Sequence, residues 1–395
     1  MQSRSKVSGS VLCVACAIGV GTFFTAQANA MNMPPPLKID GGPLGTLEVS
    51  GGLDGYFYAL SGAGNTNSPG LLGTSKSSGA EVYSTQIKIT KPTGPLRFTF
   101  ELRPQNSLVL GTKPNSPYMQ QFPLGPVYAA FATVAPNKHF SFSAGELYSV
   151  EGWEYSADFH NSNALLTDLW YVENTSSRGI SASYSNGRFS TIVSFGDGFD
   201  TGIWNFLQGT ASYTFNAENS LTLYGATNLG QTPPNATIAG YSGCPFGSCR
   251  VSDYGTYYVN STLIGGYYDY TSGNLNLVPE VQYVYAKADH KIGLNKFSSN
   301  LGLAIFGNYK FNKTPWSLGG FVEYFRNNGP DNWFLSPHAA GWGLSVTPTW
   351  QHQNIFVRGD IGLLHLTSLG SGIGYGSSGN GRNQMIAVLE TGLMF

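Results

Sequence analysis

The chain has few charged residues for its length. Asp, Glu, Lys and Arg make up 11% of its 395 residues, less than half of the about 25% found in typical soluble domains. Basic and acidic residues number 21 and 22, so there is no basic surplus of the kind that binds nucleic acid. The composition argues against an ordinary soluble enzyme and against a nucleic-acid partner.

Long apolar runs are scarce beyond residue 30, where no stretch resembles a transmembrane helix. Residues 1–30 themselves have the parts of a signal peptide: Arg4 and Lys6, an apolar core over 11–24, and a small-x-small site ending at Ala30. A membrane anchor is the alternative, although the apolar core is short for a spanning helix. Loss of Arg4 and Lys6 leaves 19 basic and 22 acidic residues, a net charge of about −3.

Cysteine is also rare. Cys244 and Cys249, in CPFGSC, are the two that lie beyond residue 30. Because an export route is oxidising, we expect a disulfide across this short loop. A metal site is the alternative, but no His or further Cys lies near the pair.

Aromatic residues and glycine are plentiful instead. Phe, Tyr and Trp make up 14% of the chain, and there are 51 glycines. Lipid accepts only helices and closed barrels, because every backbone polar group needs an internal partner there. With few charges and no apolar helix, the sequence predicts an all-β fold, a transmembrane antiparallel up-and-down β-barrel.

The number of strands follows from stretches in which apolar and polar residues alternate. Most are near the 9–11 residues that a tilted spanning strand needs. Sixteen are predicted, at 46–60, 80–90, 95–103, 126–134, 139–147, 177–184, 188–195, 208–215, 219–228, 256–270, 274–286, 299–311, 316–326, 341–350, 354–365 and 384–395.

The connections between these strands alternate in length. The short ones are turn sequences: KPTG, APNK, SNG, NAEN, TSGN, NKTP and QHQN. The long ones are 61–79, 104–125, 148–176, 196–207, 229–255, 287–298, 327–340 and 366–383. This asymmetry predicts seven periplasmic turns and eight outer loops, with 14 or 18 strands as alternatives. We expect a barrel over 46–395, preceded by a periplasmic segment over 31–45.

The chain ends on MIAVLETGLMF, a bare hydrophobic strand. Such a strand must be buried in protein or lipid, and we expect it to close the ring against 46–60. Leu393 and Phe395 also fit the signal read by the barrel-assembly machinery. Gly392 stands two residues from the position where that signal prefers glycine.

Alternation along the predicted strands places charged and polar side chains inside the barrel. Charges of both signs are tolerated there if water fills the lumen; the alternative is that they pair and plug it. The predicted pore-lining residues are Lys88, Arg97, Glu101, Arg103, Glu280, Gln282, Lys310, Glu323, Arg358, Asp360 and Glu390.

The connection 148–176 is the candidate constriction loop. It carries acidic residues with no Lys or Arg of its own to pair them. Such a loop either folds into the channel and narrows it or packs over the rim. The candidate residues are Glu151, Glu154, Asp158 and Asp168.

Asp197 and Asp200, in GDGFDTG, offer oxygens to a cation. Their number and spacing fall short of a calcium loop, so a glycine-rich turn is favoured.

The stretches GELYSVEGWEY, NSNALL, SRGISASYSNGRFS and GDGFDTGIWN, within 140–230, resemble the OmpL-like putative β-barrel porin-2 family. The resemblance implies a passive outer-membrane porin and brings no catalytic residues with it.

The expected function is therefore an outer-membrane porin through which small hydrophilic solutes or ions diffuse, in a diderm bacterium. No cofactor or metal is required, and the expected partners are lipid, the barrel-assembly machinery and, as one option, two further copies in a trimer. One alternative is a plugged barrel acting as an adhesin or structural protein. The other is a barrel enzyme, although the six histidines form no HExxH-like motif.

Overall fold

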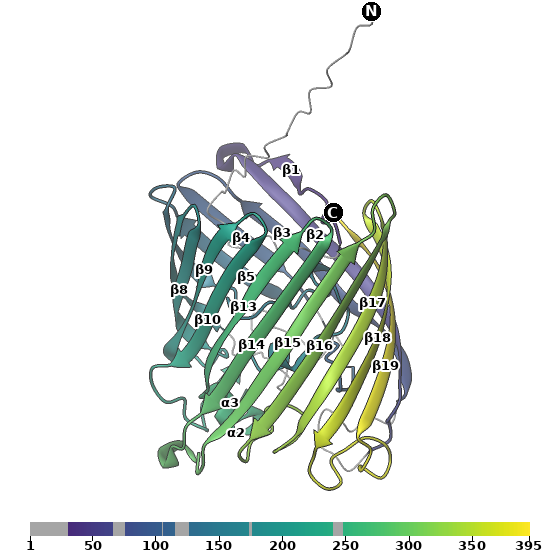
Figure 1. The fold of residues 1–395 in the computed structure, drawn as a ribbon. Helices are drawn as coiled ribbons and strands as arrows, with labels where there is room; N and C mark the ends of the chain where they lie inside the picture. The colour runs from purple at the N-terminus through teal and green to yellow at the C-terminus, as the bar shows by residue number, and fades with distance from the viewer. Residues whose placement is uncertain (1–30, 66–75, 105, 115–125, 174–175, 240–247) are drawn as a thin grey trace, which may run out of the picture.

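The computed structural model describes residues 31–395 except 66–75, 105, 115–125, 174–175 and 240–247. Its main sheet has 17 antiparallel strands, one of which, β1 (Leu37–Asp40), adds to the side of β2 (Thr46–Leu60). The other sixteen form a closed, tilted ring (Figure 1). The predicted fold class and strand number are confirmed.

The ring runs through the strands in chain order, each paired with its neighbours. After β2 it consists of β3 (Ser78–Lys91), β4 (Leu96–Leu102), β5 (Val127–Val134), β6 (Phe140–Glu146), β7 (Ser176–Asn186), β8 (Phe189–Gly198), β9 (Trp204–Asn216), β10 (Asn219–Asn228), β13 (Thr262–Ser272), β14 (Leu275–Ala286), β15 (Ser298–Lys310), β16 (Trp316–Asn328), β17 (Ala340–His352), β18 (Ile355–Ser368) and β19 (Asn383–Met394).

The ring is closed by the last strand. β19 pairs with β2 in antiparallel register, with Leu389 opposite Phe57. Phe395 extends the ladder, because its N–H donates to Gly51 O at 2.9 Å and its C=O accepts from Gly51 N–H at 2.8 Å. Closure leaves the ring with no free sheet edge.

The two ends of the barrel differ in their connections. Seven connections of two to five residues lie at the end drawn uppermost in Figure 1, the short-turn end. The opposite, long-loop end carries the other eight. One of these corrects the sequence prediction: β8 and β9 are joined by 199–203, not by a long loop over 196–207.

A second correction concerns the predicted strand over 256–270. Residues Thr256–Val259 form the short helix α3, and β13 begins at Thr262. The β-branched and aromatic residues there suggested a strand, but Tyr258 is held by hydrogen bonds from its hydroxyl to the carbonyls of Tyr171 and Glu173. Tertiary contacts therefore override local propensity. The same connection, 229–261, also holds α2 (Val251–Tyr254) and the hairpin β11 (Thr237–Ala239) and β12 (Ser248–Arg250).

Exposed apolar side chains alternate with buried side chains along the wall, as predicted. On β19, Leu389 is 56% exposed and Leu393 44% exposed, whereas Glu390 between them is fully buried. The outward apolar band is suited to lipid, and the charged residues point inward. Among the described residues, no helix is long and apolar enough to span a membrane.

Candidate pore interior

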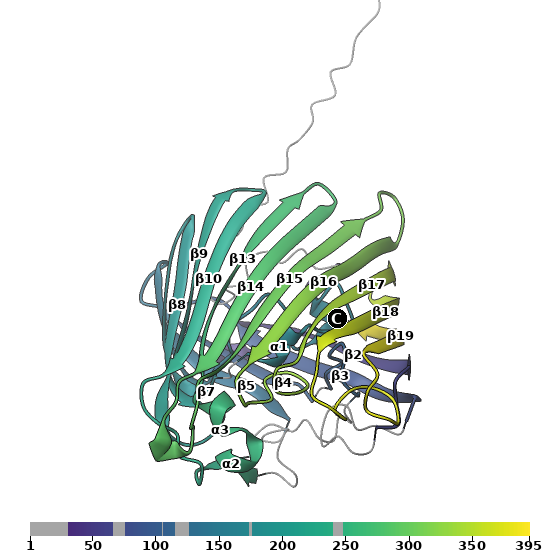
Figure 2. The same cartoon turned by 60° about the horizontal axis from the view of Figure 1, so that its bottom comes forward.

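The connection between β6 and β7 folds into the barrel. This inserted loop (residues 147–173) contains a 3-10 turn, Asp158–His160, and the short helix α1, Asp168–Tyr171. Helix α1 lies within the ring in Figure 2. Its apolar residues are buried against inward side chains of the wall. Those buried at 1% exposure or less are Ala157, Phe159, Ala164, Leu165, Leu166, Leu169 and Val172.

A second connection, between β4 and β5, reaches the same region. Val109 forms a parallel bridge with Leu166. The amide of Leu110 donates to Leu166 O at 2.9 Å, and that of Leu166 donates to Leu108 O at 2.7 Å. Two long connections therefore support each other inside the barrel and fill part of the lumen with an apolar core, which sequence analysis did not foresee.

Several predicted pore-lining residues hold the inserted loop in place. Asp360 Oδ2 accepts from the amides of Ala164 and Leu165, both at 3.0 Å. Glu323 Oε2 accepts from the Asp168 amide at 2.8 Å. These carboxylates point inward as predicted, but they lie beneath the loop, so their lining role stays a prediction.

Two neighbouring wall residues act in the same way. Glu280 Oε1 accepts from the Trp153 amide at 3.1 Å and from the Tyr224 hydroxyl at 2.6 Å. The Gln282 side-chain amide donates to Leu169 O at 2.7 Å. Backbone N–H and C=O groups of the loop thus find partners on the wall, as buried polar groups must.

The acidic residues of the loop are buried rather than exposed to open water. Asp158 is paired with Arg358 of β18 at 2.7 Å, and Arg358 also binds Glu390 of β19 at 2.6 Å. Arg358 of the wall therefore supplies the positive charge that the loop itself lacks. Glu151 is 6% exposed, and Asp168 Oδ2 accepts from the Asn300 side chain.

Glu154 is held by its own loop. Both the hydroxyl and the amide of Thr167 donate to its carboxylate. Burial raises the pKa of the Glu154 carboxyl well above its ordinary value, although these two hydrogen bonds oppose the shift.

A second group of charged residues lies on β3, on β4 and just beyond β4. Arg103 Nε lies 3.3 Å from Glu101 Oε1, and its guanidinium carbon lies 3.3 Å from the centre of the Tyr128 ring. Lys88 Nζ lies 5.3 Å from the ring centre of Tyr148 at the start of the inserted loop. These predicted lining residues lie close together, as expected from their positions on neighbouring strands.

Arg97 lies apart from this group, near the short-turn end, where its Nε donates to Gly94 O at 2.8 Å. It is half-buried. Its predicted place on the inward face of β4 agrees with the exposed side chain of Leu96 beside it.

The segment before the barrel reaches the interior from the short-turn end. Lys310, a predicted lining residue, donates from Nζ to Asn32 Oδ1 at 2.9 Å. The Asn32 amide donates to Gln351 Oε1 at 2.7 Å, and Gln351 Nε2 donates to Asn32 O at 2.8 Å. Met31 is 1% exposed and packs in a cluster with Phe159 of the inserted loop.

The strands β5 to β10 carry a wall of small hydroxyl side chains. The sequence analysis did not predict this wall, because it considered charged residues. The hydroxyl-bearing residues face inward and pair across strands: Thr133 with Ser143 at 2.8 Å, Ser141 with Ser183 at 2.5 Å, and Ser212 with Thr222 at 2.8 Å. The signal was visible as Ser at every second position of FSFS and ISAS. Small hydroxyl side chains project less far into a lumen than large apolar side chains do.

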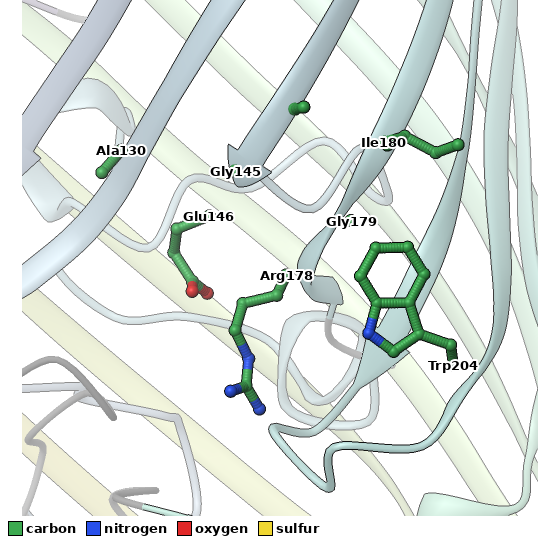
Figure 3. Close-up of a pocket in the computed structure, with 8 residues that line it drawn as sticks. Ala130, Gly145, Glu146, Arg178, Gly179, Ile180 and Trp204 are labelled. Carbon is green, nitrogen blue, oxygen red and sulfur yellow. The ribbon is translucent and has the colours of Figure 1, made fainter.

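A recess lies on the outside of the barrel near the long-loop end (Figure 3). Figure 3 shows Glu146 and Arg178 as neighbours beside Trp204. Ile180 and Trp204 are 53% and 52% exposed, so the recess belongs to the outer surface. It is lined by Ala130, Ala144, Gly145, Glu146, Arg178, Gly179, Ile180 and Trp204.

The remaining candidates lie elsewhere. Cys249 is disulfide-bonded, whereas Cys244 falls outside the described residues. Asp197 accepts hydrogen bonds from the Thr201 hydroxyl and the Gly202 amide and is paired with Arg178. Residues 199–202 of GDGFDTG therefore form a turn after β8, and Asp197 is satisfied by the chain itself. That this turn binds no cation stays a prediction.

A closed sixteen-stranded barrel with an apolar outer band and an inserted loop defines the class of outer-membrane channels. The chain belongs to the family described as "Putative beta-barrel porin-2, OmpL-like", whose model matches residues 46–395. It is an outer-membrane porin, which confirms the family resemblance and the expected location in the outer membrane.

Solved structures with the same fold are remote in sequence. OmpT of Vibrio cholerae shares 11% identity at a TM-score of 0.57, covering 91% of this chain and 100% of its own. An anion-selective porin from Comamonas acidovorans shares 12% at 0.56, covering 88% and 99%. The outer-membrane channel DcaP of Acinetobacter baumannii shares 10% at 0.55, covering 92% and 100%.

One solved form of the Vibrio cholerae protein is a trimer, with 12% identity, a TM-score of 0.54 and coverage of 88% and 99%. No curated protein sequence matches the chain significantly.

Proposed function

We propose that small hydrophilic solutes cross this porin through a passage between the inserted loop and the hydroxyl-bearing wall of β5 to β10. The observation that carries the proposal is the asymmetry of the interior. The loop is hydrogen-bonded to β14, β16 and β18 through Glu280, Glu323 and Asp360, whereas the opposite wall carries paired Ser and Thr. Hydroxyl groups both donate and accept, so they suit neutral polar solutes as well as hydrated ions.

The charged group of Lys88, Glu101 and Arg103 borders the same passage in this proposal. Lys88 and Arg103 each contact the ring of a tyrosine, which fixes their charge at one side of the opening. Fixed charges beside a narrow passage bias which ions enter. The sign of the preference is set by the balance between these two cations and the acidic residues of the loop.

We infer that the chain works as a channel without catalysing a reaction. Of the six histidines, His160 lies in the inserted loop, where its ring contacts the rings of Tyr155 and Phe159 at tilted angles. His139 and His365 bond to Ser185 O and Asn383 Oδ1 in the wall. A nucleophile beside such a base is the arrangement that hydrolysis requires, and neither of these pairs supplies one.

The assembly of the chain is proposed from its ends. Residues 1–30 direct export and are removed, residues 31–45 form a segment at the periplasmic end whose first residues enter the barrel, and Leu393 and Phe395 engage the barrel-assembly machinery. The trimer form of the Vibrio cholerae protein supports a homo-trimer for this chain, with the apolar outer band against lipid and neighbouring copies.

Planar-bilayer recording of the folded mature chain tests the channel. Long-lived stepwise openings are expected, and the reversal potential in a salt gradient reports ion preference. If protein shown to be folded carries no current, the function is instead that of a plugged barrel whose loops bind a partner.

Cysteine substitution tests where the passage runs. Ser183→Cys on the hydroxyl wall should react with a charged methanethiosulfonate reagent and lower the conductance. The matched control is Ser345→Cys, inward-facing but 1% exposed beneath the loop, where the native Ser345 hydroxyl donates to Asp360. If labelling at 345 blocked current and labelling at 183 did not, the passage would lie on the other side of the loop.

A further inference from the structure

Three carboxylates meet where the inserted loop touches the closing strands. Asp54 comes from β2, Glu390 from β19 and Asp158 from the loop. Each offers one oxygen within 4.8 Å of the oxygens of the other two. Their exposed fractions are 2%, 0% and 0%, so bulk water does not screen their repulsion.

Arg358 neutralises this group in part. It donates from Nε to Glu390 Oε2 and from Nη2 to Asp158 Oδ2, and its third nitrogen, Nη1, donates to Asn161 O at 3.1 Å. One guanidinium against three carboxylates leaves two formal negative charges in a buried site. Isolated buried charge is costly unless it is paired or coordinates a metal.

A carboxylate oxygen of the cluster that Arg358 does not engage provides the second observation. Glu390 Oε1 is fully buried and has no hydrogen-bond partner among the described residues. Ser84 is shared, because its hydroxyl donates to Asp54 Oδ2 at 2.9 Å and lies 3.0 Å from Asp158 Oδ1. A buried carboxylate oxygen without a donor is an acceptor that lacks its positive partner.

We propose that Asp54, Asp158 and Glu390 bind one divalent cation, of the calcium class, through the carboxylate oxygens that Arg358 does not engage. Hard cations with flexible coordination take carboxylate and hydroxyl oxygens, and Ser84 Oγ lies among them. A charge of +2 balances the two negative charges that remain after Arg358. The ion ties the tip of the inserted loop to β2 and β19, where the ring closes.

The competing arrangement is that the carboxylates share protons instead of a cation. The two arrangements differ in their response to metal ions. Tyr56 lies directly opposite Glu390 across the β19–β2 ladder, and Tyr83 is adjacent to Ser84. Both rings are buried near the cluster and can transfer excitation energy to a bound lanthanide.

The experiment uses the folded mature chain in detergent, stripped with a chelator and titrated with Tb³⁺ as a luminescent substitute for Ca²⁺. We expect saturable tyrosine-sensitised emission at one ion per chain, displaced by Ca²⁺. Asp54→Asn and Glu390→Gln should weaken binding by at least about tenfold. The matched control is Asp269→Asn, another inward carboxylate that bonds to Asn276 instead, and it should bind as the unmodified chain does.

Absence of saturable emission from the unmodified chain would overturn the proposal, as would equal binding by Glu390→Gln. Folding of each variant is checked by its heat-shifted mobility on a denaturing gel. If the variants do not fold, thermal unfolding of the unmodified chain still tests the site. Its thermal midpoint should rise with Ca²⁺ and fall with chelator, and an unchanged midpoint refutes the site. These readouts need no ion conduction, so they are independent of the proposed passage.

Discussion

At the scale of single residues, position across the wall decides what a side chain does. Arg358 is buried on the inward face and paired with two carboxylates. Ile361, three residues further along β18, is 60% exposed on the outward face. Removing one member of a buried ion pair leaves an uncompensated charge. The cost of replacing an outward residue depends instead on the transfer of the new side chain into lipid.

Leu389→Arg tests the outward face. Leu389 stands in the middle of β19 with 56% of its surface exposed. An arginine near the bilayer midplane should lower the free energy of unfolding by about 2–4 kcal/mol. Urea unfolding in phospholipid vesicles measures this change. Leu389→Ala is the control and should lose clearly less, and equal losses in the two variants would mean that the position does not face lipid.

At the scale of elements, the inserted loop is positioned by a few wall carboxylates. Asp360→Ala removes the acceptor of the Ala164 and Leu165 amides and of the Ser345 hydroxyl. Leaving buried donors unpaired costs about 1–3 kcal/mol each, so the loop should loosen.

Hydrogen exchange at the amides of Ala164 and Leu165 measures this loosening and should accelerate in Asp360→Ala. The control Asp269→Ala removes a buried carboxylate that bonds to Thr271 and Asn276 and should leave both amides protected. Unchanged exchange in Asp360→Ala would show that the apolar packing holds the loop without these hydrogen bonds.

The N-terminal segment is a second positioned element. Gln351→Ala removes both hydrogen bonds to the main chain of Asn32, so we expect faster hydrogen exchange at the Asn32 amide. His352→Ala, at the next position of β17, is the control and should leave that rate as it is. Equal rates in all three proteins would mean that the segment is held by its other contacts, those of Met31 and Lys310.

The sequence predicts the wall better than the interior. Strands such as Asn383–Met394 alternate along their whole length, and one face must be apolar, so residues like Leu389 and Glu390 are assigned by parity. Asp158 and Arg358 are 200 residues apart, and no local pattern links them. The contact between Met31 and Phe159 likewise depends on two segments entering the lumen from opposite ends, which periodicity cannot report.

At the scale of the whole molecule, Phe395 extends the pairing that closes the ring. Deletion of Phe395 removes its two hydrogen bonds to Gly51 and the proposed terminal aromatic signal. We expect a smaller heat-shifted, folded fraction in outer-membrane preparations. Phe395→Tyr keeps the pairing and an aromatic ring, so its yield should be near normal. Normal assembly of the deleted chain would exclude Phe395 as part of the signal.

The contacts of the inserted loop also impose an order on folding. The amides of Ala164 and Leu165 have their acceptor in Asp360, which lies 196 and 195 residues later in the chain. The ion-pair partner of Asp158 is Arg358, on the second-to-last strand of the ring. Contacts between such distant residues form slowly. We therefore expect the loop to reach its final place only when the last hairpin arrives, so that ring closure and narrowing of the bore occur together late in folding.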